Sequence, residues 1–370
     1  MKGAALGRCR NGFPLGQSIA AARAKKWLRW TCAALAVLYP ACLMGAALAL
    51  RLIGEKWWVT GAVLYLPRIA FAAPLPFIAG FSAALGLYKL LWTQLAAILL
   101  ILFPLMGLAL PGRAHRAGGA KVVRVLSYNI NTALGGLDGI VEEIDRYSPD
   151  VVLLEEIGSR ERLESSLASR YASVLVSGQF LVATRFPIVS SYDPERVTLR
   201  GRSHSPRFIK TAIETPVGRI AFYAVHPLSP RAGLQGLRGG AGLRRELLSG
   251  RLFAGTNTTK FLDDADLRAL QVQEFAEAAA REPGPTVIAG DTNLPDLSYI
   301  LSQHLSSFQD GFAKVGSGFG YTFPVDYGRR PWMRIDRIFA NDKLNFVRFE
   351  VGRSRASDHL CVVADVQAKE

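Results

Sequence analysis

The chain has 370 residues, half of them apolar, and a formal net charge of +14. Residues 1–112 hold 11 basic residues and one acid, Glu55, whereas the remainder holds 33 basic and 29 acidic residues, so the excess reflects membrane topology and argues against binding of nucleic acid through overall charge. The four cysteines (Cys9, Cys32, Cys42 and Cys361) provide neither a disulfide framework nor a cysteine-based metal site.

The first third of the chain has the pattern of a membrane segment. A basic tail, residues 1–29, precedes apolar runs that are long enough to cross a hydrocarbon core of about 30 Å. We expect a transmembrane segment over residues 30–112, with three helices at 30–52, 61–87 and 90–110. Two crossings are the alternative, if the stretch around Arg68 lies only in the interface.

The distribution of charge predicts the orientation of this segment. Seven basic residues precede the first apolar run, and such clusters stay on the cytoplasmic side. With three crossings, the distal part of the chain then lies outside the cytoplasm. Basic residues after the third run favour the opposite placement more weakly. We therefore expect a multi-pass protein of the cell membrane with an extracytoplasmic distal domain.

Residues 113–120 are linker-like, and residues 121–370 have the composition of an α/β domain. Short apolar runs bounded by turn residues predict strands, and two amphipathic stretches predict helices. The expected strands are 122–130, 151–154, 171–176, 179–184, 188–191, 211–215, 219–225, 286–290, 335–339 and 361–366. The expected helices are 138–147, with Asp138 as its N-cap, and 264–281. Two strand-rich halves, each with a helix, predict two packed sheets with helices outside.

Between these halves lies a long glycine-rich insert, residues 229–259, which we expect to be irregular. It contains several arginines, of which Arg231, Arg244 and Arg245 are candidate ligands for an anionic substrate group. A solvated loop without a role in binding is the alternative.

Polar residues follow the apolar strands at the points where the strands stop. Asp291 and Asn293 come directly after one buried strand, next to Gly290, which permits close approach of the backbone. An Asx turn explains this pair equally well when it is considered alone. The same placement recurs in the distal domain at Asn129, Glu156, His226, Asp336, Asp358 and His359. Polar residues at six strand ends of one domain indicate a common site.

This ordered set resembles the endonuclease/exonuclease/phosphatase superfamily over roughly residues 121–370. The resemblance implies a four-layer αββα sandwich of two mixed sheets, and it also implies a role for each of these residues. Glu156 would bind the catalytic Mg²⁺, with Asn129 beside it and Asp358 on the metal side. Asp291 and Asn293 would orient the attacking water and the phosphate, and His226 would contact the phosphoryl oxygens. Asp336 would hold His359.

Physical chemistry agrees with such an enzyme. Hydrolysis of a phosphate ester needs an in-line water and neutralised equatorial charge, which a hydrated Mg²⁺ supplies, with Mn²⁺ as the alternative ion. Asp291 is the candidate general base, with His359 as the alternative. Glu155 stands where the family often has Gln.

Three functions are compatible with this sequence. The membrane segment favours a lipid-linked phosphate or pyrophosphate substrate, and the layout is similar to that of bacterial membrane-anchored members linked to glycopeptide resistance. A tethered nuclease that degrades DNA is the rival enzyme, although the distal domain has a net charge of only +4. A non-catalytic membrane scaffold is a third alternative, against which the complete acid and histidine set argues. The lipid bilayer is an expected partner, and the sequence indicates no obligate protein partner.

Overall fold

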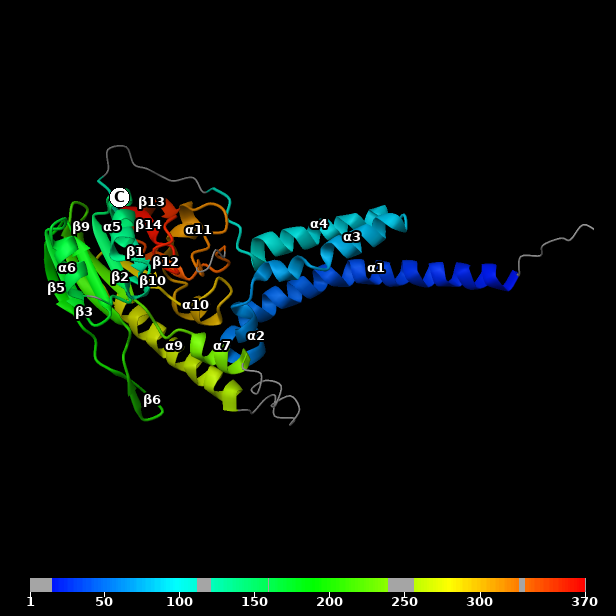
Figure 1. The fold of residues 1–370 in the computed structure, drawn as a ribbon, viewed down its shortest axis with the longest axis horizontal. Coiled ribbons are helices and arrows are strands. Elements are labelled where there is room, and N and C mark those ends of the chain that lie inside the picture. Colours follow the sequence, from blue (N-terminus) through cyan, green and yellow to red (C-terminus); the bar gives the residue numbers. More distant parts are fainter. Residues whose placement is uncertain (1–14, 112–120, 159, 239–255, 326–329, 370) are drawn as a thin grey trace, which may run out of the picture. The chain divides into compact units, whose positions relative to one another are not determined.

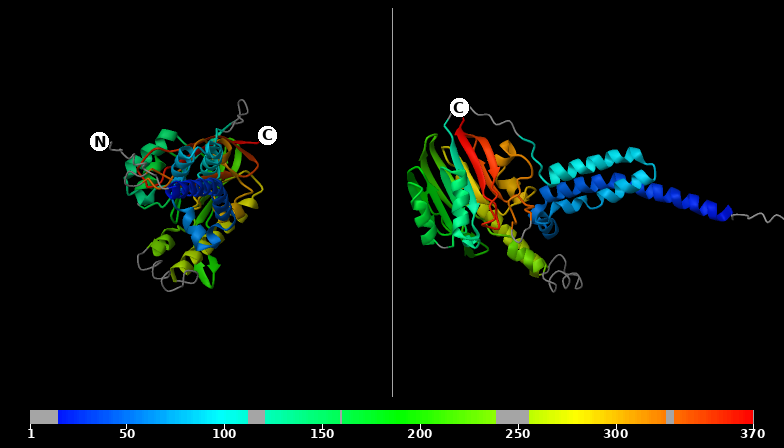
Figure 2. Two further views of the ribbon diagram at one scale, coloured as in Figure 1. Left: turned by 90° about the vertical axis from the view of Figure 1, so that its right-hand side faces the viewer. Right: turned by 45° about the horizontal axis from the view of Figure 1, so that its top comes forward.

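The computed structural model describes residues 15–111, 121–158, 160–238, 256–325 and 330–369. The chain divides into two compact units. One consists of Met1–Gly45 and Ile69–Leu102, and the other of Ala46–Arg68 and Phe103–Glu370. The elements are labelled in Figure 1 and seen from two further sides in Figure 2.

The first unit is helical. It contains most of α1 (Leu15–Leu52), together with α3 (Leu75–Ala84) and α4 (Leu91–Leu100). Within it, the buried Gln94 side chain donates a hydrogen bond from Nε2 to the carbonyl oxygen of Ala36, at 3.2 Å. Such interhelical hydrogen bonds supply attraction that apolar contacts cannot supply in lipid.

Two helices among the described residues are long and apolar enough to cross a membrane, Ala20–Leu52 and Tyr88–Leu105. A third candidate combines Trp58–Leu64 with Arg68–Ala84, which meet at a bend of 99°. The bend falls at Pro67, because proline lacks the N–H group that would continue the helix. These helices indicate that the protein associates with a membrane, and the count of three crossings stays a prediction.

The second unit contains two six-stranded mixed sheets. The first has the order β13-β14-β1-β2-β4-β3, and the second has the order β11-β12-β10-β9-β8-β5. The strands of the first sheet are β1 (Val123–Asn129), β2 (Val151–Glu155), β3 (Ser173–Ser177), β4 (Phe180–Thr184), β13 (Leu344–Val351) and β14 (Val362–Ala368). Those of the second are β5 (Ile188–Tyr192), β8 (Phe208–Thr215), β9 (Gly218–Val225), β10 (Thr286–Asp291), β11 (Gln309–Asp310) and β12 (Asp336–Ala340). A separate ribbon pairs β6 (Val197–Leu199) with β7 (Arg202–His204).

Helices cover the outer faces of both sheets. These and the remaining helices of the unit are α2 (Trp58–Leu64), α5 (Leu137–Tyr147), α6 (Arg160–Ala168), α7 (Arg231–Arg238), α9 (Thr256–Ala280), α10 (Tyr299–His304) and α11 (Gly311–Val315). Helices α5 and α6 pack on the first sheet through buried residues such as Ile144 and Leu167. Helices α9 and α10 pack on the second sheet through Phe275 and Ile300. The predicted four-layer αββα sandwich is therefore confirmed.

The core between the sheets explains where polar strand ends lie. Every second residue of a strand points into this core, such as Val125 of β1, Leu153 of β2 and Val287 of β10. The same alternation, continued to the strand ends, reaches Asn129, Glu155, His226, Asp291 and Asp336. These side chains are all buried. The alternation that builds the core thus also gathers polar groups at one end of it.

Three local predictions were wrong. Helix α9 begins at Thr256 rather than at residue 264, because Phe261 in its first turns packs against Trp58 and Leu237. Residues 231–238 of the insert form α7 rather than an irregular loop, and the same contact with Phe261 buries Leu237. Helix α5 has Gly136 as its N-cap, and Asp138 lies in the first turn instead.

Candidate functional site

Asp291 lies at the centre of the polar strand ends. It is the last residue of β10, and its antiparallel partner on β12 is Asp336. Gly290 permits this arrangement: its φ is +153°, and a Cβ there would lie 1.9 Å from the carbonyl oxygen of Val225 on β9. The close approach that the sequence indicates at Gly290 is therefore to the neighbouring strand.

After Asp291 the chain turns sharply. The Asn293 backbone has a φ of 52°, and its N–H donates to Oδ1 of Asp291 at 2.8 Å. This is an Asx turn, so that interpretation of the pair is correct. The Asn293 side chain donates from Nδ2 to the carbonyl oxygen of Pro227 at 3.1 Å, which links the end of β10 to the end of β9.

Asn129 connects Asp291 to Glu156. Its Nδ2 lies 3.2 Å from Oδ2 of Asp291 and 3.3 Å from Oε1 of Glu156, while its Oδ1 accepts from the N–H of Asn131. Glu156 follows β2 in the left-handed region, with a φ of 54°. This strained conformation turns its carboxylate toward Asn129 rather than toward the outer face.

His359 is held by a carboxylate. Its Nδ1 lies 2.9 and 3.0 Å from the two oxygens of Asp336, and its Nε2 lies 3.7 Å from Oδ2 of Asp291. Its ring also lies against Phe323, with the centroids 4.5 Å apart. Burial would lower the pKa of His359, but the carboxylates of Asp336 and Asp291 outweigh this effect and raise the pKa to about 10. The imidazole is therefore cationic at neutral pH.

His226, in contrast to His359, is uncharged at neutral pH. Burial, with the positive charges of Arg207 and His359, lowers its pKa to about 3, so the ring is neutral. Its Nδ1 lies 2.9 Å from the Oε1 oxygen of Gln179, which makes Nδ1 the protonated nitrogen. Its Nε2 lies 3.3 Å from Glu156 and 3.6 Å from Asp291, yet it makes no hydrogen bond.

The negative charges of the carboxylates in this site have few positive partners. Burial raises the pKa of Asp291 to about 7, with the His359 charge opposing this shift and Asp336 adding to it. Burial and Asp336 also raise the pKa of Glu155, which is inaccessible and accepts a hydrogen bond from Ser127. Residues with strongly shifted pKa values cluster at functional sites.

These observations test whether a hard divalent cation fits. The lone pair of neutral His226 Nε2 faces carboxylate oxygens of Glu156 and Asp291 with no proton between them, an arrangement that a cation would relieve. Carboxylate oxygens, such as those of Glu156 and Asp291, are donors that Mg²⁺ prefers, and Asn129 adjoins both through Nδ2, so the acidic donors fit. Asp291, Asp336 and His359 also meet the spacing of a metal-binding group, but His359 Nδ1 already pairs with Asp336.

The strand ends open into a pocket of about 460 Å³. The polar residues that line it include Glu156, His226, Asp291, Asn293, Asp358 and His359. The apolar and aromatic residues that line it include Tyr65, Pro67, Leu234, Phe323, Trp332 and Met333. Asp358, half-buried beside Ser357, therefore lies in the same pocket as Glu156.

Of the candidate substrate-binding arginines, Arg231 lines this pocket as an exposed residue at the start of α7. Arg244 and Arg245 lie outside the described residues. The prediction overlooked Gln179, which positions His226, because nothing in its hairpin sequence distinguishes it from an ordinary turn residue. It also overlooked Tyr65, because that residue belongs to the segment expected to cross the membrane.

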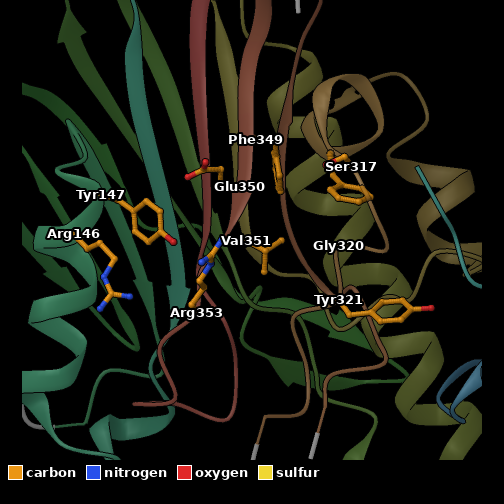
Figure 3. A pocket seen from close by; sticks show the side chains of 10 residues that line it. Arg146, Tyr147, Ser317, Gly320, Tyr321, Phe349, Glu350, Val351 and Arg353 are labelled. Atoms are coloured by element: carbon orange, nitrogen blue, oxygen red, sulfur yellow. The ribbon is translucent and has the colours of Figure 1, made fainter. Parts of the chain in front are cut away.

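A second pocket, of about 480 Å³, is lined by other residues (Figure 3). Arg146 and Tyr147 at the end of α5 line one side, and Tyr321 lies on the opposite side. It includes none of the predicted site residues, and Arg146 is paired with Glu143 at 3.0 Å. The strand-end pocket is thus the one that joins acids, imidazoles and an amide.

A two-sheet sandwich with this site at its strand ends has the architecture of a metal-dependent phosphoester hydrolase. The chain matches the model of the Endonuclease/Exonuclease/phosphatase family over residues 126–359, which is more than half of its length. It therefore belongs to that family, whose members are metal-dependent phosphoester hydrolases. No curated protein sequence gives a significant match.

Three solved structures illustrate the likeness in fold. An endonuclease/exonuclease/phosphatase from Beutenbergia cavernae DSM 12333 is 22% identical, covers 67% of this chain and 72% of its own, and has a TM-score of 0.46. The 3′ phosphatase NExo from Neisseria, bound to a product DNA hairpin, is 15% identical, and the match covers 67% of this chain and 100% of that one, with a TM-score of 0.49. Humanized D. rerio TDP2 is 17% identical, and the match covers 67% of this chain and 99% of that one, with a TM-score of 0.46.

Proposed function

We propose that this protein is a membrane-anchored, Mg²⁺-dependent phosphohydrolase that cleaves a phosphodiester or a pyrophosphate by in-line attack of water. The observation that carries this proposal is the convergence of a cationic imidazole, a neutral imidazole and Glu156 on the buried carboxylate of Asp291. Phosphoryl transfer requires positioning and charge stabilisation more than covalent chemistry, and these groups supply both.

The residues that would hold the ion are Glu156, Asn129 and Asp358. When bound, Mg²⁺ (or Mn²⁺) supplies a Lewis acid that neutralises charge on a phosphoryl oxygen. The chain itself contributes three carboxylate or amide side chains that line or adjoin one pocket.

The remaining groups handle the proton and the phosphate. With its pKa near 7, Asp291 is suited to take a proton from the attacking water, which Asn293 helps to orient. His359, held by Asp336, places a positive charge beside the phosphoryl oxygens. His226 presents Nε2 to the same group, and the negative charge of a bound phosphate favours a proton on that nitrogen.

The apolar residues that line the pocket support a substrate that joins phosphate to an apolar group. Phe323, Trp332 and Met333 line it within the same cavity as His359 and Asp291. A lipid-linked phosphate or pyrophosphate has this combination, and the candidate membrane spans in the same chain would hold the enzyme near such a substrate. Arg231, and by extension Arg244 and Arg245, would bind the anionic headgroup, so their replacement by alanine would raise KM.

We further propose that the catalytic unit lies outside the cytoplasm. Residues 46–68, which include the end of the first candidate span, belong to the same compact unit as the sandwich. The seven basic residues before the first candidate span favour a cytoplasmic tail, and an odd number of spans would then put the sandwich on the other side of the membrane. Protease added to intact cells should cleave the sandwich but spare the N-terminal tail.

One assay tests the function. Full-length protein in nanodiscs, supplied with Mg²⁺, is incubated with a polyprenyl pyrophosphate and, separately, with plasmid DNA. We expect phosphate release from the lipid, no nicking of the plasmid, and loss of activity in Glu156→Ala and His359→Ala. Nicking without phosphate release would assign the protein as a nuclease, and activity retained in both variants would contradict the site.

A further inference from the structure

The connector, defined as residues 53–68, follows the first candidate span and contains the first half of the bent candidate, and it belongs to the same compact unit as the sandwich. It contains a 3₁₀ turn (Gly54–Lys56) and helix α2. A connection that merely links two spans would expose its ionisable residues. Here Glu55 is 3% and Arg68 5% exposed, and Tyr65 is 4% exposed.

Glu55 fixes the first half of the connector. Its carboxylate accepts hydrogen bonds from the Ser298 hydroxyl at 2.5 Å and from the N–H of Tyr299 at 2.9 Å, at the start of α10. A carboxylate at a helix N-terminus satisfies N–H groups that have no partner within the helix. Gly54 permits the approach, because its φ is +49° and a Cβ there would lie 2.9 Å from the nitrogen of Tyr299.

Tyr65 brings the second half of the connector to the active site. Its hydroxyl donates to the carbonyl oxygen of Asn293 at 3.1 Å and accepts from Nη1 of Arg268 at 3.3 Å. Its own carbonyl oxygen accepts from Nε1 of Trp332 at 3.4 Å. Arg268 donates from Nε to the carbonyl oxygen of Leu228 at 2.6 Å. The Tyr65 hydroxyl thereby supports the turn at Asn293 directly. Through Arg268 it also supports the turn that follows His226.

We propose that the connector is part of the active site and that Tyr65 is a positioning residue for hydrolysis. This inference rests on the proposed function. The Tyr65 hydroxyl holds the strained turn from Asp291 to Asn293 and, through Arg268, the turn after His226. Loss of such a contact misplaces reacting groups by a fraction of an ångström, which lowers the rate more than it weakens binding.

The test compares two tyrosines in the full-length protein in nanodiscs. Tyr65→Phe removes the hydroxyl and keeps the ring in the pocket. Tyr321→Phe is the matched control, because the Tyr321 hydroxyl also donates to a backbone carbonyl, that of Met106, at 2.8 Å and outside the site. We expect kcat to fall about 10-fold in Tyr65→Phe, with KM changed less than about twofold and the pH profile unaltered. Wild-type kcat in Tyr65→Phe would overturn the proposal.

Hydrogen exchange provides a readout that does not need turnover. The Asn293 amide should exchange faster in Tyr65→Phe than in Tyr321→Phe, and equal protection in both would overturn the proposal. If the wild-type protein hydrolysed no phosphate ester, the proposed function would fail. The exchange measurement would still show whether the Tyr65 hydroxyl holds the turn at Asn293.

A second variant acts at a distance from the pocket. Glu55→Gln weakens the attachment of the connector to α10 and leaves Tyr65 intact, so it covers the case in which Tyr65→Phe does not fold. We expect faster exchange at the Tyr299 amide together with a reduced kcat. Faster exchange at Tyr299 with wild-type kcat would show that the connector is not needed for catalysis.

Discussion

Two groups of buried or partly buried acids in this protein differ in their counter-charges. The strand-end cluster, defined as Asn129, Glu155, Glu156, His226, Asp291, Asp336 and His359, has one cationic partner for several acids. The arginine cluster, defined as Asp296, Asp310, Arg334 and Arg337, has two guanidinium groups for two carboxylates. Asp291 and Asp296 are only five residues apart in the chain.

The arginine cluster is fully paired. Arg334 lies 2.6 Å from Asp296 and 2.8 Å from Asp310, and Arg337 lies 3.0 and 2.8 Å from the same carboxylates. Burial alone would raise the pKa of Asp296 and of Asp310, but the two arginines outweigh it and lower both. In the strand-end cluster burial prevails, and the pKa values of Asp291 and Glu155 rise. We expect the first arrangement to stabilise the fold and the second to provide charge that a bound ligand neutralises.

The largest expected effect that separates the clusters is on catalysis. Asp291→Asn should reduce hydrolysis about 10³-fold, because the proposed base is lost, without lowering Tm, because a repulsive buried charge is removed. Asp342→Asn, at an exposed turn residue, is the control for the loss of an acid. Steady-state assays and thermal unfolding measure the two quantities, and a lower Tm at full activity would reverse the assignment.

Asp296→Asn should have the opposite effect. Two buried guanidinium groups would lose half of their counter-charge, and breaking buried pairs typically costs about 3–5 kcal/mol of stability. We expect a lower urea midpoint and an unchanged kcat per folded molecule. A urea midpoint equal to that of Asp342→Asn would show that Arg334 and Arg337 do not depend on Asp296.

The two clusters also predict opposite pH dependences of stability in the presence of EDTA. A lowered pKa, as at Asp296, gives stability above the unfolded value of about 4 that is lost as pH falls through the folded pKa. A raised pKa, as at Asp291, means that the folded state binds more protons, so stability declines as pH rises from about 4 to about 7. Asp291→Asn should match wild type in Tm near pH 4 and exceed it near pH 8. Parallel curves for the two proteins would contradict the raised pKa of Asp291.

The smallest expected effect is that of Glu155→Gln. Burial raises the pKa of Glu155, which favours its neutral form, and glutamine is neutral and has the same shape, so hydrolysis should stay within about threefold of wild type. Because glutamine does not titrate, the Tm of the variant should exceed that of wild type at pH 8 and match it at pH 4. Loss of activity in this variant would show instead that Glu155 acts as a carboxylate in the site.

Much of the fold could be predicted because local periodicity and burial agree. The strands that end at Asn129, Glu155 and Asp291 are largely apolar, and each was expected close to its observed bounds. Strand β13 and helix α10 were not expected, since their sequences lack a clear period and their burial depends on β14 and on Glu55. The start of α9 was misplaced because Phe261 is stabilised by Trp58, which lies more than 200 residues earlier in the chain.

The residue types of the candidate site were determined by the sequence alone, since oxygen and imidazole groups at the ends of apolar strands are visible without coordinates. Their charges were not, because they depend on neighbours that only folding brings together. Asp336 and Arg337 are adjacent in the chain, yet alternation along β12 sends the first to His359 and the second to Asp296. The tertiary structure alone decided that Tyr65 reaches the turn at Asn293, because a hydrogen bond across 228 residues has no local signal.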